Sequence, residues 1–357
     1  MKRALWIVAA AVPCLLLMLP ASSLYYKSTA GEGCAKCHEI RGNWDTWHAS
    51  THRGVACSEC HGDSLTGGLD FHLGNFRRLI KHVSGNVPEQ IRIKGLDNAA
   101  MLARCQKCHQ QEFADWKMGP HGSTFAKFFL DQKHNHQRLL MDDCLRCHGM
   151  DYEGGVRDLV TPVDTKGPWT MRDPRWADQP AIPCLACHEM HRHGQPLGKL
   201  APRDQRSSAR EAIHRPSLAL FDRREMEHVA NANLPVPSML DGARPVRMSP
   251  DARQALCYQC HASLATRQVA SGDDRTPMGV HEGLSCLACH EKHGQQTRAS
   301  CANCHPRLSN CGIDVEKMDT TFISTKSKHN IHFVKCGDCH TKGVPKRRNG
   351  TVLAAGQ

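Results

Sequence analysis

Aromatic side chains are scarce in this sequence: Phe, Trp and Tyr together make up 5% of the 357 residues. The hydrophobic fraction is 40%, and that figure already includes twenty cysteines. So little apolar side-chain mass excludes a large conventional hydrophobic core in a chain of this length. Something other than side chains is therefore expected to fill the interior.

Long hydrophobic runs are also scarce. One apolar run covers residues 4–19 behind two basic residues, and no other stretch approaches the about 20 residues that a membrane helix needs. Tyr25, Tyr26 and Lys27 follow this run and are typical of an interfacial anchor. We predict that residues 1–33 hold the protein to the cytoplasmic membrane as an uncleaved anchor. The alternative is an exported protein whose signal peptide is cleaved near residues 21–23.

Cysteine and histidine, in contrast, are abundant, with 20 and 24 residues. Such a cysteine content argues against a plain cytosolic enzyme and leaves a disulfide scaffold, a zinc array or covalently held haem. Eighteen of the twenty cysteines form nine Cys-x-x-Cys pairs, and a histidine follows each pair directly. Zinc sites do not require that histidine, and disulfides would leave all nine histidines unexplained.

The nine Cys-x-x-Cys-His motifs therefore predict nine covalently bound haem c groups. Two thiols at this spacing form thioethers to the two vinyl groups of one porphyrin, and the adjacent histidine reaches the iron as the proximal ligand. The predicted thioether cysteines are Cys34, Cys37, Cys57, Cys60, Cys105, Cys108, Cys144, Cys147, Cys184, Cys187, Cys257, Cys260, Cys286, Cys289, Cys301, Cys304, Cys336 and Cys339. The predicted proximal ligands are His38, His61, His109, His148, His188, His261, His290, His305 and His340.

Fifteen further histidines lie outside the motifs, more than nine irons need as sixth ligands. Trp47-x-x-Ser50-x-His52 shares its spacing with Trp116-x-x-Gly119-x-His121, and Cys-His-Glu-x-His occurs twice. On a short helix a histidine three residues after a proximal ligand lies on the same face and can ligate a neighbouring haem. The predicted distal ligands are His52, His82, His121, His136, His191, His281, His293, His329 and His332. Spacing leaves open the choices His72 or His82, His134 or His136, His191 or His193, and His329 or His332.

The formal charge of +11 suggests an acidic partner at first. Two propionates per haem and one net positive charge per ferric centre bring the holoprotein to roughly +2 when oxidised and −7 when reduced. Most basic residues thus offset the cofactors, and we expect no nucleic-acid partner.

Gly and Pro punctuate the spaces between motifs, and period-2 apolar alternation is scarce. We predict a mainly α protein with long irregular loops, little or no β-sheet and a haem-packed core. After the anchor, residues 34–200 form a five-haem part and residues 201–256 a helical and Pro-rich connector, with the helix around residues 207–230. Residues 257–345 form a four-haem part, and residues 346–357 a basic flexible tail.

Two resemblances carry the functional expectation. Cys34 to His61, with Trp47, Ser50 and His52 between the motifs, resembles the membrane-anchored quinol dehydrogenases of the NapC/NirT/NrfH type. Some members ligate the first haem through a methionine just after the motif, where this chain has Glu39. The segments 256–261 and 283–294 together resemble the doubled-motif region of periplasmic decahaem cytochromes.

These resemblances imply an electron wire on the periplasmic side of the cytoplasmic membrane, taking electrons from menaquinol, ubiquinol or a quinol-oxidising partner. Its acceptors would be periplasmic or outer redox proteins, within an oligomer or a multi-subunit complex. The spare histidines are numerous enough to ligate the second side of every iron. Such bis-histidine coordination leaves no open iron site, and it favours electron transfer over substrate conversion. Two alternatives stay open: a multihaem reductase of a small nitrogen or sulfur compound, for which the first haem or Cys311 is the place to look, and a secreted subunit of a conductive filament.

Overall fold

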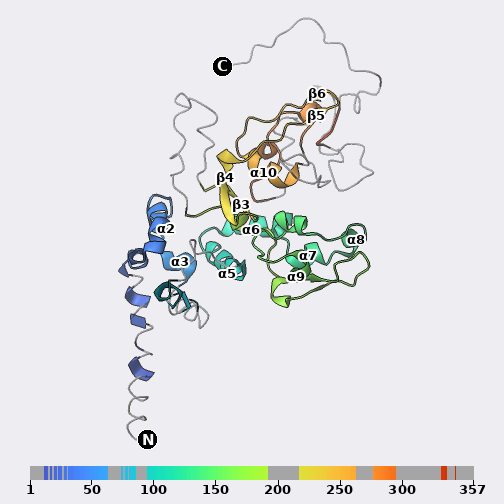
Figure 1. Cartoon of the computed structure of the whole chain (residues 1–357). Coiled ribbons are helices and arrows are strands. Elements are labelled where there is room, and N and C mark those ends of the chain that lie inside the picture. The colour runs from blue at the N-terminus through green and yellow to red at the C-terminus, as the bar shows by residue number, and fades with distance from the viewer. Residues whose placement is uncertain are drawn as a thin grey trace, which may run out of the picture. The chain divides into compact units, whose positions relative to one another are not determined.

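The computed structural model describes residues 31–62, 95–191, 217–262, 276–294 and 331–335, with scattered positions in 12–29 and 74–85 and at residue 342. The chain divides into two compact units, Met1–Asn233 and Leu234–Gln357. Figure 1 shows the course of the chain from the amino terminus to the carboxyl terminus. Each unit is described by itself.

The first unit contains mostly short helices. Its described elements are η1 (Cys34–Lys36), α2 (His38–His48), α3 (Cys57–His61), α5 (Gly95–Cys105), α6 (Gln110–Met118), η2 (Pro120–Gly122), α7 (Phe125–Phe129), α8 (Gln132–Asn135), η3 (Asp142–Arg146), α9 (Val156–Leu159), β1 (Val160–Thr161), β2 (Thr170–Met171), η4 (Pro174–Trp176), η5 (Cys184–Ala186), β3 (Ala219–Asp222), β4 (Glu227–Ala230) and η8 (Asn231–Asn233).

The second unit is smaller. Its described elements are β5 (Leu240–Asp241), β6 (Arg244–Pro245), α10 (Gln254–His261), η9 (Gly279–His281) and η10 (Cys286–Ala288). The described strands of both units form three antiparallel two-stranded sheets, β1–β2, β3–β4 and β5–β6. The predicted fold class, mainly α with irregular loops and very little sheet, is confirmed.

The predicted helix around residues 207–230 is wrong for its described part. Residues 219–230 form the hairpin β3–β4, which pairs Phe221 with His228 across the strands. The hairpin also bonds to the chain beside the fifth motif, because Glu189 N–H donates to Ser217 and Ala219 N–H donates to the Cys187 carbonyl, at 2.9 and 3.1 Å. These backbone partners from another segment outweigh the weak helical preference of a charged stretch. Residues 207–216 lie outside the described residues.

One conventional hydrophobic core cluster lies in the first unit. Five aromatic rings pack there with small aliphatic side chains, and Phe125 is fully buried at the centre. The cluster comprises Phe125, Phe129, Leu140, Leu145, Tyr152, Val156, Leu159, Val160, Trp169, Trp176 and Ala181. The low aromatic content of the whole chain hid this local concentration, which surrounds the fourth motif. A haem-packed core elsewhere in the chain stays a prediction.

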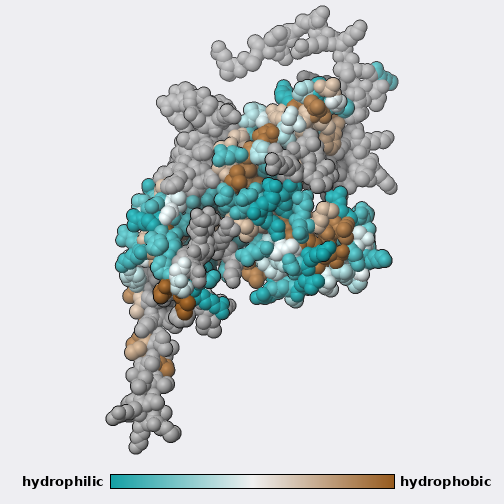
Figure 2. Space-filling view, viewed as in Figure 1, coloured by the Kyte–Doolittle hydropathy of each residue, from teal (hydrophilic) through white to brown (hydrophobic). Residues whose placement is uncertain are grey.

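Among the residues that the structure describes, no helix is both long and apolar enough to cross a membrane. Much of the predicted anchor in residues 1–33 lies outside the described residues. Of its described positions, Val12, Leu17 and Leu24 expose large apolar side chains. Figure 2 shows brown hydrophobic atoms along this amino-terminal segment, whereas the described surface of the remaining first unit is mostly hydrophilic.

Candidate haem centres

Seven of the nine predicted motifs lie in the described part of the chain, five in the first unit and two in the second. The eighth and ninth motifs, the distal candidate His329 and the unpaired Cys311 lie outside it. The residues concerned are Cys301, Cys304, His305, Cys311, His329, Cys336, Cys339 and His340. Their predicted roles stay predictions.

Four of the seven described motifs form single tight turns. In the third motif the Cys108 N–H donates to the Cys105 carbonyl at 3.2 Å, and the His109 N–H donates to the same carbonyl at 2.9 Å. The fourth, fifth and seventh motifs repeat both hydrogen bonds. Residues i, i+3 and i+4 of such a turn share one face. The two sulfurs and the imidazole therefore lie on the same side, the donor set that one haem c requires.

Three proximal histidines face a histidine from elsewhere in the chain. Ring centroids are 6.1 Å apart for His52 and His109, 5.9 Å for His61 and His191, and 6.1 Å for His290 and His332. Two metal–imidazole bonds of about 2 Å, plus the half-widths of two rings, place such centroids roughly 6 Å apart. The three pairs therefore fit one iron between each two rings.

A second feature typical of metal-ligating histidines is a hydrogen bond from the ring nitrogen that does not bind the metal. The Nδ1 of His136 lies 2.9 Å from the Thr165 carbonyl oxygen, and the Nδ1 of His191 lies 3.1 Å from that of Asn43. A carbonyl oxygen accepts only, so Nδ1 carries the proton and Nε2 keeps its lone pair. Ligating histidines commonly make this second bond, which fixes the tautomer and the ring orientation.

His228 shows the opposite arrangement. Its Nε2 donates to the Leu185 carbonyl oxygen at 2.7 Å, so the nitrogen that the other histidines leave for a metal is occupied. His228 was not among the predicted distal ligands, and the structure supplies a reason for leaving it out.

Local hydrogen bonds position His52. Trp47 Nε1 donates to the Val55 carbonyl at 3.1 Å, Ser50 Oγ donates to the Trp47 carbonyl at 2.7 Å, and the His52 N–H donates to Ser50 Oγ at 3.1 Å. The Trp-x-x-Ser-x-His pattern is thus a turn that presents the histidine. Desolvation, and then the neighbouring His109, lowers the pKa of His52 below its ordinary value, which favours the neutral, metal-binding ring.

His191 reaches its position by a route that the sequence did not predict. The expectation of a short helix from His188 to His191 is wrong, because His188 forms a β-bridge with Leu218 and the chain then bends. The described residues after His290 are not helical either. Extended backbone carries a side chain farther from its motif than a helical turn would.

The first motif has a different environment. His82 Nδ1 lies 2.5 Å from Glu39 Oε1, and the same oxygen lies 3.3 Å from His38 Nε2. The rings of His38 and His82 are 5.4 Å apart. Glu39, which sequence reasoning noted only as a departure from a methionine, therefore joins the proximal histidine to a predicted distal one.

Successive motifs lie in contact through their cysteines. The Cys34 thiol hydrogen-bonds to Cys57, which lowers the pKa of Cys57 to about 7 and raises that of Cys34. The Cys257–Cys286 pair repeats this relationship and lowers the pKa of Cys257 to about 7. Thioether sulfurs do not titrate, so these shifts concern the chain before haem attachment.

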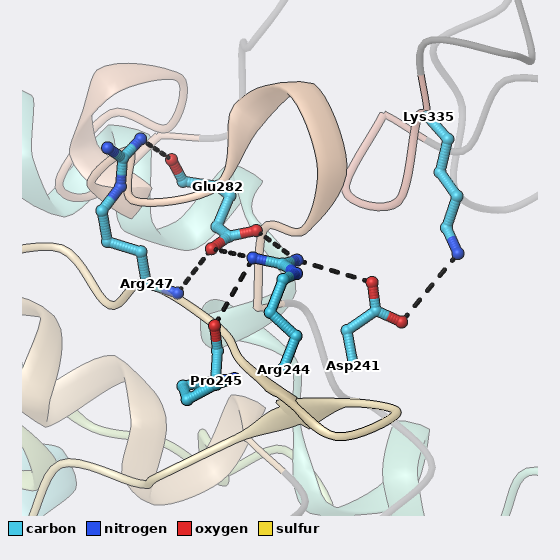
Figure 3. A network of polar contacts seen from close by, with 6 residues as sticks. All are labelled: Asp241, Arg244, Pro245, Arg247, Glu282 and Lys335. Carbon is cyan, nitrogen blue, oxygen red and sulfur yellow. Dashed lines mark hydrogen bonds and ion pairs between the residues drawn. The ribbon is translucent and has the colours of Figure 1, made fainter.

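In the second unit, a network of hydrogen bonds and ion pairs joins β5 and β6 to two segments that carry predicted distal ligands (Figure 3). Arg244 donates two hydrogen bonds to the Glu282 carboxylate, at 2.8 and 2.7 Å, and the Arg247 N–H donates a third, at 2.7 Å. Arg244 foremost lowers the pKa of Glu282 to about 2. Asp241 lies 3.5 Å from Arg244 and 3.9 Å from Lys335. The sequence offered no signal for these residues, since they belong to no motif.

Further hydrogen bonds join the same two chain segments, residues 278–281 and 331–334, which carry predicted ligands. The Met278 and Val280 N–H groups donate to the His332 and Val334 carbonyls at 2.7 and 2.9 Å, and His281 Nδ1 donates to the Ile331 carbonyl at 3.0 Å. Gly279 has φ +70°, and a Cβ there would lie 2.1 Å from the Val334 carbonyl oxygen, so only glycine permits this approach. For His121, His136, His281 and His293 we assign no opposite proximal ligand.

Comparisons with known families agree with the motif chemistry. Residues 27–197 match the family model of outer membrane cytochrome MtrC/MtrF-like, domains II/IV, and residues 242–306 match that of cytochrome c3. No curated protein and no solved structure matches the chain. The chain is a multihaem c-type cytochrome that binds haem c covalently and transfers electrons to or from other redox proteins. The NapC/NirT/NrfH resemblance is not among these matches.

Proposed function

We propose that this cytochrome holds nine haems c and relays electrons through them outside the cytoplasmic membrane. Haem c, when bound, supplies a reversible one-electron iron couple. The observation that carries the proposal is the contact between cysteines of successive motifs, Cys34 with Cys57 and Cys257 with Cys286. Because each cysteine marks the attachment edge of its porphyrin, touching thiols bring neighbouring attachment edges together.

The first unit extends this relay. Arg104 Nη1 donates to the Cys60 carbonyl at 2.8 Å and so ties the second motif to α5, which ends at Cys105 in the third motif. Trp116 Nε1 donates to the Ile182 carbonyl at 3.1 Å and ties α6 to the residues just before the fifth motif. These hydrogen bonds tie the segments that carry the second, third and fifth motifs together, which supports a relay between their haems.

Paired imidazoles support electron relay rather than substrate conversion. Histidines on both sides of an iron leave no coordination position for nitrite, hydroxylamine or a sulfur compound. Five haems in residues 34–200 and four in residues 257–345 would form the two parts of the relay. We do not propose a reductase activity for the second, third and seventh motifs, whose proximal histidines face a second histidine.

The direction of electron flow is part of this proposal: electrons enter from the membrane and leave toward acceptors farther out. The exposed apolar side chains of Val12, Leu17 and Leu24 support an amino-terminal contact with the membrane, where menaquinol, ubiquinol or a quinol-oxidising partner would donate electrons. The match to a family named for outer membrane cytochromes supports acceptors farther out. A complex with further redox proteins would complete this path.

Two measurements test the proposal. Intact masses of the mature protein from membrane and soluble fractions count the haems and show whether residues 1–33 are retained; nine haems on an uncleaved, membrane-bound chain are expected. Stopped-flow reduction by a menaquinol analogue then tests the donor, and complete reduction of all haems from a single entry point is expected. Fewer than nine haems, or no reduction by quinol, would contradict the respective part.

A further inference from the structure

The three facing histidine pairs share a property that their sequence positions do not suggest. His52 stands just before the second motif but faces His109 of the third, and His191 stands just after the fifth but faces His61 of the second. His332 stands just before the ninth motif but faces His290 of the seventh. In each pair the spare histidine meets a motif other than its nearest neighbour in the chain.

We infer that His191, His52 and His332 are the sixth ligands of the second, third and seventh haems. This assignment rests on the proposed function, since it requires that these motifs hold haem c. It rests equally on the ring separations of 5.9–6.1 Å, which match the span of two imidazoles across one metal.

Hydrogen bonds other than the ring contact position the spare histidine of each pair. Asn43 accepts from His191 Nδ1, and the Trp47 and Ser50 turn presents His52. For His332 the support is its backbone, because its carbonyl accepts from the Met278 N–H at 2.7 Å. Each ligand is therefore positioned by hydrogen bonds that need no cofactor, as expected for a built ligand site.

Each assigned ligand also ties two distant segments together. His191 joins the end of the fifth motif to the second, and at the same time joins it to α2 through Asn43. An iron between His61 and His191 would cross-link residues that no described strand or helix connects. Such ligation stabilises the folded state in the way that metal binding stabilises small metal-dependent domains.

The ring planes give each centre its own spectroscopic signature. The planes meet at 21° for His290 and His332, at 41° for His61 and His191, and at 63° for His52 and His109. Nearly parallel imidazoles act on the same iron d orbital and give a rhombic low-spin EPR signal. Steeply crossed imidazoles act on both d orbitals about equally and give a highly anisotropic signal.

The test uses the full-length, haem-loaded protein with single substitutions. His52→Ala is expected to convert one low-spin haem to high spin and to remove a highly anisotropic component from the difference EPR spectrum. His332→Ala is expected to remove one rhombic component, and His191→Ala a component of intermediate character. His228→Ala is the matched control, because its Nε2 is bonded to Leu185, and no haem should change its spin state.

Histidine-to-methionine variants at the same three positions serve where an alanine variant does not fold. In each variant the affected haem is expected to stay low-spin, because methionine replaces histidine as its sixth ligand. The midpoint potential of that haem alone is expected to rise. Unchanged low-spin content in His52→Ala, His191→Ala or His332→Ala overturns the corresponding assignment, and a high-spin haem in His228→Ala overturns the argument from ring nitrogens. A wild-type mass without the expected haems would instead overturn the proposed function.

Discussion

The guanidinium of Arg244, in β6, donates to both carboxylate oxygens of Glu282, the residue after η9, at 2.8 and 2.7 Å. Planar bidentate pairs of this kind fix orientation as well as distance. Glu282 directly follows His281 and stands four residues before Cys286 of the seventh motif, so we expect this ion pair to influence the placement of predicted iron ligands.

Arg244→Gln should therefore perturb one or two haems of the second unit without unfolding the protein. The Arg244 side chain is 53% exposed, so the loss of global stability should be small, although the Glu282 side chain is only 12% exposed. The expected result is a broadened low-spin EPR signal and a shifted midpoint potential for the affected haem. Arg224→Gln, which removes an exposed pair with Asp222 at 3.5 Å, is the control and should leave the spectrum unchanged.

The contacts between Arg244 and Glu282 also depend on pH, and they are lost in acid. The pKa of Glu282 falls from 4.5 to about 2, so its stabilising contacts are complete above pH 4.5 and are lost as the pH falls toward 2. EPR spectra recorded from pH 7 down to about pH 2 should show the second-unit haems changing only at the acid end, where Glu282 takes up its proton. In Glu282→Gln this change should be absent, and an equal change in both proteins would refute the role of Glu282.

Glu39 should lower the midpoint potential of the first haem. A carboxylate that accepts from a ligating histidine raises the basicity of that ligand and favours ferric iron. Glu39→Gln is expected to raise one midpoint potential by on the order of tens of millivolts, since 59 mV is tenfold for one electron. Spectroelectrochemical titration measures the shift. Glu112→Gln, whose carboxylate lies 4.0 Å from His109 Nδ1, should give a smaller shift.

Asp151 should destabilise the folded protein at neutral pH. Burial raises its pKa from 3.8 to about 6, and among the described residues its Oδ1 and the Oδ1 of Asn98 have no hydrogen-bond partner. The folded state thus keeps a proton that the unfolded chain has lost, and the free energy of unfolding falls as the pH rises from about 4 to 6. Asp151→Asn should stabilise the protein at pH 7 by on the order of 2 kcal/mol and remove that slope.

Denaturant unfolding at pH 4 and pH 7 measures this difference. Asp164→Asn is the control, because hydrogen bonds from Lys166 and Gly167 lower the pKa of this exposed carboxyl. A variant at position 151 that is less stable than the wild type at pH 7 would show that the carboxylate is stabilised by a contact that outweighs its desolvation.

Phe125 should dominate the stability of the fourth-motif region. Its ring is fully buried and contacts Phe129, Tyr152 and Trp176 at centroid distances of 5.9, 6.3 and 5.1 Å. Phe125→Ala should lower the free energy of unfolding by about 3–5 kcal/mol, through lost burial and the cavity left behind. Met118→Ala removes a side chain that is 79% exposed and should cost far less. Equal losses would contradict a core centred on Phe125.

Sequence reasoning succeeded where the chemistry is local. Two cysteines and a histidine within five residues predict a haem attachment site regardless of the rest of the chain, and four of the described motifs form the tight turn that this chemistry needs. The helix expected around residues 207–230 failed because the hairpin β3–β4 finds its backbone partners beside His188, far away in the sequence. The aromatic cluster around Phe125 was missed because average composition conceals local concentration.

The sequence by itself determined that this chain is a multihaem c-type cytochrome and predicted where each haem attaches, because covalent attachment depends on neighbouring residues alone. Only the tertiary structure decided which spare histidine faces which motif. His52 meets His109 and His191 meets His61 because an imidazole pair spans two segments, and the approach of two segments depends on all the packing and hydrogen bonding between them.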